Sequence, residues 1–407
     1  MKIKLGELIE SIGDGIHGTP EYDINGEYYF INGNNLYQGQ IVVNDETLKV
    51  SEKEYNRIKR NIGKNTLLLS INGTLGNVAK YNNEKVALGK SVCYINVKDS
   101  TLIDYVYFVM NSLEFKKYMN MVSHGSTIKN FAPSQVLDFE FDTTSLENQK
   151  FIGNIYSKLI ALINNYENIN NKMDVILRQI YNYSFFQYND EKLKYDENLN
   201  YNIPANWSCL KLKDCLQSIN TGLNPRNHFK FSNTEKIKYI TVKNLTSDGL
   251  MLLDTYDRIN KESKKIIHNR SKIAPGDVLY ASIAPLGRCY LIVDEPEDWD
   301  INESVFSIRV NEEIITPEYL YMVLTSDYFI KKAEHNSSGS IFNGIRISVL
   351  ENMYILVPSK DKIALFTKKT KSIFKYKNSN SNKINKIREL IKFLTPLLMN
   401  NNIKIED

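Results

Sequence analysis

The residue types that most often perform chemistry occur in this 407-residue sequence without the spacing that the chemistry needs. The five histidines form no HxH or HxxxH pair, and no Ser-His-Asp or paired-carboxylate arrangement can be argued. The four cysteines have neither CxxC spacing nor a nearby histidine pattern, which favours buried or idle thiols over a metal site or a disulfide. We therefore predict no catalytic residue and no metal site in this chain.

Two short motifs resemble cofactor-binding or base-flipping sequences, but each lacks an essential part. Residues 13–18 (GDGIHG) match GxGxxG, a motif that needs a following helix to hold phosphates, and the next residues (TPEY) do not start a helix. Residues 224–227 (NPRN) resemble the Asn-Pro-Pro-aromatic motif of adenine methyltransferases, but Asn227 replaces the aromatic residue that would stack on a flipped base. We predict that the chain does not itself bind S-adenosylmethionine.

Polar loops rich in Ser, Thr, Asn and Gly recur at matching places in the two halves of the chain. Residues 70–76 match residues 282–288, residues 124–129 match residues 338–343, and residues 32–35 match residues 242–244. Such loops suit phosphate contacts through backbone N–H and hydroxyl groups, and Asn can read adenine in the major groove of DNA. Ordinary turn chemistry is the alternative, and recurrence in both halves argues against it.

These loops and the basic side chains beside them give the candidate DNA-contacting residues. In the first half they are His17, Asn32, Asn34, Asn35, Asn72, Thr74, Lys90, His124, Ser126 and Lys129. In the second half they are Arg226, Lys243, Asn244, Ser282, Arg288, Ser338, Ser340, Asn343 and Arg346. Arg288 and Arg346 each lie beside a recurring loop, where Arg could bind guanine or clamp a phosphate, and a surface salt bridge is the alternative.

A module that the chain repeats must position these loops. Residues 4–8 (KLGEL) return as residues 211–215 (KLKDC), and residues 105–112 return as residues 319–326, at an offset of about 210. Strand-like apolar runs followed by a helix occur in the same order in both copies. A tandem duplication gives internal pseudo-twofold symmetry, which suits a target with two similar halves, and duplex DNA is the commonest such target.

Bulk charge does not identify either globular half as a DNA-binding domain. The net charge of the chain is +4, but residues 1–145 carry about −2, residues 201–357 about −1 and the segment from Pro358 to the end about +8. If the globular halves hold DNA, local groups of Lys and Arg must do so.

Two long helices are the clearest structural signal, and each carries an apolar seam with 3-4 spacing over about five heptads. The first predicted seam is Ile152, Ile155, Leu159, Leu162, Tyr166, Ile169, Met173, Ile176, Ile180 and Tyr183. The second is Ile363, Phe366, Thr370, Ile373, Lys377, Asn380, Ile384, Ile387, Ile391, Leu394 and Leu398. We predict that the helices pack on each other; the alternative is that each covers the core of its own half.

The chain at this point resembles a known family, the specificity subunits of type I restriction–modification systems. Residues 14–20 (DGIHGTP) with Gly26 and Phe30-Ile31 resemble the opening of the family's target-recognition domains. Residues 72–76 (NGTLG) and 284–287 (APLG) resemble its Gly-x-x-Gly strand–turn, and residues 146–152 (LENQKFI) resemble the Leu-x-Glu-Gln-x-x-Ile start of its conserved helix. The second helix start, residues 357–363 (VPSKDKI), lacks the Glu-Gln pair, so its partner contact is expected to differ if that pair binds the partner.

The resemblance covers essentially the whole chain and implies an α+β fold with two similar target-recognition domains separated by two long antiparallel helices. The expected domains are 1–145 for the first recognition domain, 146–190 for the first spacer helix, 191–357 for the second recognition domain and 358–402 for the second spacer helix. The helices would then bind the partner subunits. The candidate partner-binding residues are Gln149, Ile152, Leu159, Ile169, Ile176, Ile373, Ile387 and Leu394.

The resemblance also implies a function: a non-catalytic subunit that reads a bipartite DNA site, one half per domain. Such a subunit carries two adenine-N6 methyltransferase subunits, which bind S-adenosylmethionine, with or without two restriction and translocation subunits. No signal region and no apolar run of roughly 18 residues is seen, so a cytoplasmic protein with no membrane partner is expected. The alternatives are an adaptor whose duplicated domains bind protein, and an enzyme with a degenerate methyltransferase core.

Overall fold

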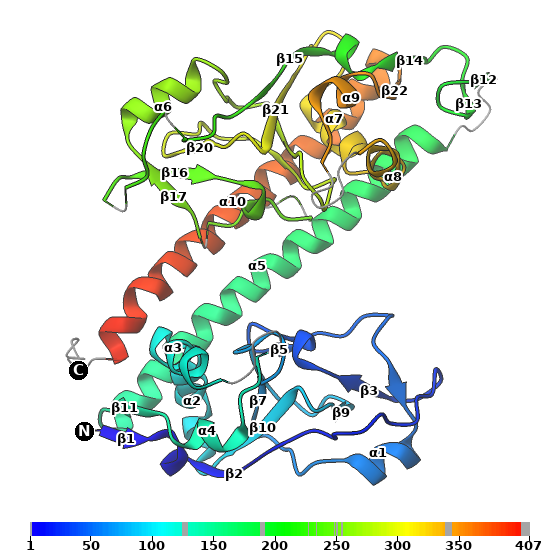
Figure 1. The fold of residues 1–407 in the computed structure, drawn as a ribbon. Coiled ribbons are helices and arrows are strands. Elements are labelled where there is room, and N and C mark those ends of the chain that lie inside the picture. The colour runs from blue at the N-terminus through cyan, green and yellow to red at the C-terminus, as the bar shows by residue number, and fades with distance from the viewer. Residues whose placement is uncertain are drawn as a thin grey trace. The chain divides into compact units, whose positions relative to one another are not determined.

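The computed structural model describes residues 2–123, 129–187, 192–226, 228–232, 234–247, 249, 251–253, 255–337 and 344–399. The chain forms two compact units, Met1–Asn164 with Ile387–Asp407 and Asn165–Lys386. Two long helices, α5 (Leu146–Phe186) and α10 (Lys360–Met399), therefore each contribute a segment to both units (Figure 1). In the described residues no helix is long and apolar enough to cross a membrane.

The globular part of the first unit is built from two small sheets and a terminal strand pair. The first sheet has the antiparallel order β2 (Ile9–Asp14), β10 (Val92–Val97), β7 (Thr66–Ser70), β8 (Val78–Lys80). The second has the order β6 (Lys49–Val50), β3 (Tyr28–Ile31), β9 (Val86–Leu88), and β1 (Lys2–Lys4) pairs with β11 (Glu140–Asp142). Every residue of β7 is buried, as its continuous apolar run requires.

Short helices cover these sheets, and their starts follow from capping side chains. They are α1 (Glu52–Ile58), α2 (Ile103–Asn111), α3 (Leu113–Val122) and α4 (Pro133–Leu137). Ser51 caps α1 by accepting a hydrogen bond from the N–H of Glu54, and Ser112 caps α3 in the same way through Phe115. A small hairpin, β4 (Leu36–Tyr37) with β5 (Gln40–Ile41), follows the 3₁₀ turn η2 (Gly33–Asn35).

The second half of the chain repeats this arrangement element by element, so the predicted α+β fold with an internal repeat is confirmed. Its first sheet has the order β15 (Leu216–Thr221), β21 (Val305–Val310), β18 (Val278–Ala281), β19 (Cys289–Leu291). Its second sheet has the order β17 (Asp257–Ile259), β16 (Ile237–Ile240), β20 (Trp299–Ile301). β14 (Ser208–Lys211) pairs with β22 (Tyr354–Val357), and an additional hairpin, β12 (Leu193–Asp196) with β13 (Tyr201–Pro204), precedes them. The helices are α6 (Lys261–His268), α7 (Pro317–Leu324), α8 (Asp327–His335) and α9 (Ile347–Glu351).

Strand register corrects one predicted correspondence between the halves by a single residue. Val92 of β10 pairs with Ser70, and Val305 of β21 pairs with Ala281. Residues 70–76 therefore match residues 281–287 and not residues 282–288. Gly76 and Gly287 then occupy the same left-handed position, with φ of 86° and 83°. The shifted match results from aligning the Ser-Ile pair that both segments contain.

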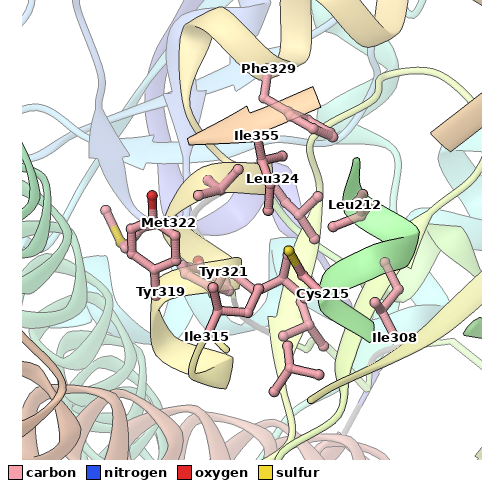
Figure 2. Close-up of a cluster of buried hydrophobic side chains, with 14 of the residues drawn as sticks. Leu212, Cys215, Ile308, Ile315, Tyr319, Tyr321, Met322, Leu324, Phe329 and Ile355 are labelled. Carbon is pink, nitrogen blue, oxygen red and sulfur yellow. The ribbon is translucent and has the colours of Figure 1, made fainter. Parts of the chain in front are cut away.

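The core of the second unit surrounds α7, of which residues 318–324 are buried, and Figure 2 shows part of it. Residues of the β15–β21–β18–β19 sheet and of both long helices belong to the same core. Tyr319 is fully buried and donates a hydrogen bond to the carbonyl of Leu356 at 2.8 Å. Phe185 of α5 and Phe366 of α10 pack at 5.2 Å between ring centroids in the same core. Aromatic side chains of this size each contribute a large buried apolar area, so this core ties both long helices to the globular part.

The long helices confirm one predicted seam and correct the other. On α10, the predicted positions Ile363, Phe366, Thr370 and Ile384 are buried. On α5 the buried stripe lies one residue away from the predicted seam. Three predicted positions, Ile169, Ile176 and Tyr183, are 40%, 46% and 63% exposed. The buried seven-residue repeat of α5 is instead Tyr156, Ile163, Asn170 and Leu177.

Buried polar residues explain why the predicted seam of α5 is displaced. Asn170 is fully buried and accepts a hydrogen bond from Nδ2 of Asn380 at 2.9 Å, and Asp174 forms an ion pair with the buried Lys377. The order of these contacts shows that α5 and α10 run antiparallel in the second unit. A pattern based on apolar residues assigns Asn170 to the solvent face and selects the neighbouring stripe instead.

Adjacent residues on α5 give a direct test of this seam. Leu177→Ala should lower the free energy of unfolding by about 2–5 kcal/mol, since it leaves a cavity in a packed core. Ile176→Ala should change it by no more than about 0.5 kcal/mol, because Ile176 is exposed. Urea unfolding of the full chain followed by circular dichroism measures both, and equal losses at the two positions would contradict the assignment.

Candidate nucleic-acid interface

In the first unit, several strand ends meet at one edge through backbone hydrogen bonds. Beyond β2, the N–H of Ile16 donates to the carbonyl of Leu88 at 2.9 Å, and the N–H of Gly89 donates to Ile31 at the end of β3 at 2.9 Å. The N–H of Ile71, beyond β7, donates to Ser91 at 2.9 Å. We call residues 14–18, 32–34, 71–74, 89–91 and 129–131 the first loop edge.

The same contacts form an equivalent edge in the second unit. The N–H of Asn302 donates to the carbonyl of Ile240 at 2.9 Å, and the N–H of Ser282 donates to Ser304 at 3.0 Å. The N–H of Ile345 donates to Ser282 at 2.9 Å, as Phe131 does to Ile71 in the first unit. We call residues 221–226, 241–243, 282–285, 302–304 and 344–346 the second loop edge.

Close backbone approach explains a glycine on each edge. A Cβ atom at Gly15 would lie 2.2 Å from the carbonyl oxygen of Leu88, and one at Gly222 would lie 2.0 Å from that of Ile301. These glycines therefore let the end of β2 or β15 pack on the second sheet. Residues 16–27 contain no helix, so the GxGxxG match serves this packing and not a phosphate site at a helix start.

Most of the predicted residues of the first loop edge present polar groups to solvent. Asn32, Asn34, Thr74 and Lys90 are exposed, and Asn72 is half-buried. The exposed ring of His17 bonds Oδ2 of Asp14 through Nε2 at 2.7 Å. Asn32 accepts a hydrogen bond from Ser91 Oγ at 3.1 Å, and the exposed Lys129 bonds Asn120 through Nζ at 3.0 Å. The edge thus combines amides and hydroxyls with two lysines.

The second loop edge is also exposed and has a different set of charges. Arg226, Lys243 and Arg346 are exposed. Arg288 follows the turn between β18 and β19, where its Nε donates to the carbonyl of Pro285 at 3.1 Å and partial burial lowers its pKa. Asn224 donates a hydrogen bond to Glu303 Oε1 at 2.5 Å.

Three predicted DNA-contacting residues make hydrogen bonds within the chain. Asn35 donates to the carbonyl of Val42 and accepts from the N–H of Asn32, both at 2.9 Å. Asn244 is buried and donates to the carbonyls of Leu252 and Thr255, and Ser282 is buried and donates to that of Ser304. Their polar atoms bond the backbone of neighbouring turns, a use that residue type alone does not reveal.

Some predicted residues lie outside the part of the chain that the structure describes, and the prediction missed other residues of the loop edges. His124, Ser126, Ser338, Ser340 and Asn343 lie outside the described residues. Four residues that the prediction did not include lie on the two edges: Ser91, Asn130, Asn224 and Glu303. Aligning β10 with β21 would have found Glu303, because Val92 and Val305 begin equivalent strands and Glu303 then matches the predicted Lys90.

The candidate partner-binding residues of the helices differ in burial. Gln149 is buried and donates to Thr143 Oγ1 and to the carbonyl of Thr144, both at 2.9 Å, and Ile152 lies in the core of the first unit. These two residues hold α5 to its own unit. Ile169 and Ile176 are exposed, whereas Leu159, Ile373, Ile387 and Leu394 are half-buried.

The family of the chain is decided by comparison with known proteins. A family model described as the type I restriction modification DNA specificity domain matches residues 1–174 and again residues 204–392. The chain belongs to this DNA specificity family. Because the model matches twice, each half of the chain carries one copy of the family's DNA-recognising domain.

Individual members of the specificity family are similar to the whole chain or to half of it. The MjaIX specificity subunit of Methanocaldococcus jannaschii is 22% identical over 397 residues, which cover 96% of this chain and 87% of that relative. The HindI specificity subunit of Haemophilus influenzae is 26% identical over 207 residues, which cover 49% of this chain and 42% of that relative. A crystal structure of the S subunit from M. genitalium has a TM-score of 0.55 at 16% identity, covering 100% of this chain and 96% of the other, which supports the fold.

Two glycines of the same motif test how the first loop edge is built. Gly15→Ala should destabilise the chain by about 1–3 kcal/mol, because its Cβ would collide with the backbone of β9. Gly18→Ala is the matched control: its Cβ meets nothing within 4 Å, so a change of at most about 0.5 kcal/mol is expected. Thermal unfolding of the purified variants decides, and equal stability of the two would refute the packing role of Gly15.

Proposed function

We propose that this specificity subunit reads a bipartite duplex DNA site, with each loop edge contacting one half-site. The observation that carries the proposal is that the same backbone hydrogen bonds build the same edge twice, with exposed polar and basic side chains on both. Two such domains on one face of B-DNA would take half-sites on the order of 10 bp apart, centre to centre. An asymmetric site follows, because the side chains of the two edges differ.

Affinity in this proposal comes from local cations and not from bulk charge. Lys129 on the first edge, and Arg226, Lys243 and Arg346 on the second, are placed to neutralise phosphates. Because residues 1–145 and 201–357 each carry a slight net negative charge, the rest of each globular half would repel the DNA backbone. This arrangement favours binding in one orientation over non-specific adhesion.

The proposal assigns catalysis to partner subunits. Two adenine-N6 methyltransferase subunits, which bind S-adenosylmethionine, would dock on the long helices in the cytoplasm, with or without two restriction and translocation subunits. Support comes from α5 in the second unit, where Ile169, Ile176 and Tyr183 form an exposed apolar stripe at seven-residue spacing. A partner helix with the same spacing could cover such a stripe.

Exchange of one recognition domain tests independent reading. Replacing residues 1–145 by the matching domain of a relative should change one half-site of the methylated DNA sequence and preserve the other half-site and the gap. The reason is that residues 165–386, with their own edge, are unchanged. Long-read mapping of methylated adenines in cells that express the chimera with its methyltransferase gives the result; a change in both half-sites would contradict it.

A binding control separates DNA recognition from an adaptor role. Duplex DNA affinity of the assembled complex should fall steeply as salt rises, because neutralised phosphates release counterions. A complex that binds no duplex at low salt would favour the alternative, in which the duplicated domains bind protein.

The exposed stripe of α5 gives a separate test of assembly. Ile176→Asp should reduce copurification of the methyltransferase subunits at least about tenfold, since a charge buried at an interface without a partner costs several kcal/mol. The stability of the free subunit should stay within about 0.5 kcal/mol, because Ile176 is exposed there. Asn171→Asp, at an exposed position on another face of α5, is the control, and normal copurification of the Ile176 variant would refute this docking face.

A further inference from the structure

One position on the two loop edges is equivalent in backbone and opposite in charge. Gly89 and Asn302 donate equivalent hydrogen bonds to the ends of β3 and β16, and Ser91 and Ser304 accept equivalent ones. The residue between each pair is Lys90 on the first edge and Glu303 on the second, two residues before β10 and β21 begin.

The neighbours of this position also differ. His17 and Asn224 are equivalent, because each follows by two residues the glycine that packs on the second sheet. Phe30 and Tyr239 are equivalent in β3 and β16, since they pair with Ala87 and Asp300 in the parallel strands. The first edge thus has His17, Lys90 and Phe30 at the positions where the second has Asn224, Glu303 and Tyr239.

The fold does not require these side chains. The same backbone hydrogen bonds form around Lys90 without a carboxylate and around Glu303 without an ammonium group. A residue that only held the loop in place would be expected to keep its charge in both copies. Recognition of two different half-sites explains a reversal of charge at one position on a repeated backbone.

The two side chains differ in their surroundings. Lys90 is exposed and has no hydrogen bond or ion pair within the described ranges. Glu303 is half-buried and accepts a hydrogen bond from Asn224 through Oε1, while its Oε2 is buried beside Tyr239. Tyr239 donates to the carbonyl of Leu223 at 2.5 Å, and its pKa is raised by burial and then by the charge of Glu303 and a hydrogen bond with it.

We propose that Lys90 and Glu303 are the specificity-determining pair of the two edges: Lys90 reads a guanine and Glu303 reads a cytosine. The ammonium group of Lys90 can donate to O6 and N7 of guanine, and the carboxylate of Glu303 can accept from the N4 amino group of cytosine. Asn224 is a positioning residue that orients the carboxylate. This inference rests on the proposed function, since it assigns bases within the same half-sites.

Charge reversal at each position provides the test. The full-length chain carrying Lys90→Glu or Glu303→Lys is expressed with its methyltransferase subunits, and methylated adenines are mapped across the host genome. With Glu303→Lys, one position of one half-site should change from cytosine to another base. Methylation of sites that have cytosine there should fall at least about tenfold, in line with the discrimination that a single base contact supplies. Lys90→Glu should change only a guanine in the other half-site, the one altered by exchange of residues 1–145.

Matched variants separate base reading from a structural or phosphate contact. Glu303→Gln keeps the size of the side chain and should relax the choice of base at the same position, which a merely structural role would not do. Lys53→Glu on α1 and Glu295→Lys between β19 and β20 reverse exposed charges away from the edges and should leave the sequence unchanged.

The outcomes distinguish this inference from the proposed function. An unchanged motif with both charge reversals, or methylation that falls equally at all sites with the motif intact, would overturn base reading at this position. A wild-type complex that methylates no bipartite sequence would overturn the proposed function, and this inference with it. Thermal unfolding of each variant identifies any loss that comes from misfolding, and the Gln variant then carries the test.

Discussion

Buried polar contacts between α5 and α10 are the constraint on which the second unit depends. Apolar contacts such as those of Leu177 and Phe366 tolerate sliding along a helix, because one aliphatic surface resembles the next. The hydrogen bond between Asn170 and Asn380 and the ion pair of Asp174 with Lys377 do not, since any shift leaves buried polar groups unpaired. Replacing such a buried pair by apolar residues can even stabilise a protein, so the value of these contacts lies in fixing register.

A second set of polar contacts then holds the globular part of that unit on α10. Ser381 and Asn385 both donate to the carbonyl of Met251, at 3.3 and 2.8 Å, and Asn378 donates to Asp294 at 2.6 Å. In the first unit Asn164 of α5 plays a similar part, since its Nδ2 donates to the carbonyl of Gln38 at 3.0 Å. Directional bonds thus fix where each globular part sits along its own helix segment, and the loop edge is carried with it.

The sequence predicted the features that depend on apolar periodicity and failed where buried polar atoms decide. The repeat, the α+β class and the α10 seam follow from apolar patterns, and the structure agrees. The α5 seam was displaced because Asn170 is buried and Asp174 is half-buried, at positions that a hydrophobicity pattern assigns to solvent. At the site, residue type identifies the donors and acceptors of Asn35, Asn244 and Ser282, and only the fold reveals the backbone carbonyls that they bond.

Recognition and folding use different atoms on the loop edges, and this separation explains how one module can serve two DNA sequences. The edges are built by backbone groups, such as those of Ile71 and Gly89, whose hydrogen bonds do not depend on side-chain identity. Only a few positions resist change, notably Gly15 and Gly222, where any Cβ would meet a neighbouring strand. The exposed positions between them can exchange charge without loss of buried area. A duplicated domain of this kind can therefore acquire a new half-site through edge substitutions while the sheets and the helix contacts stay as they are.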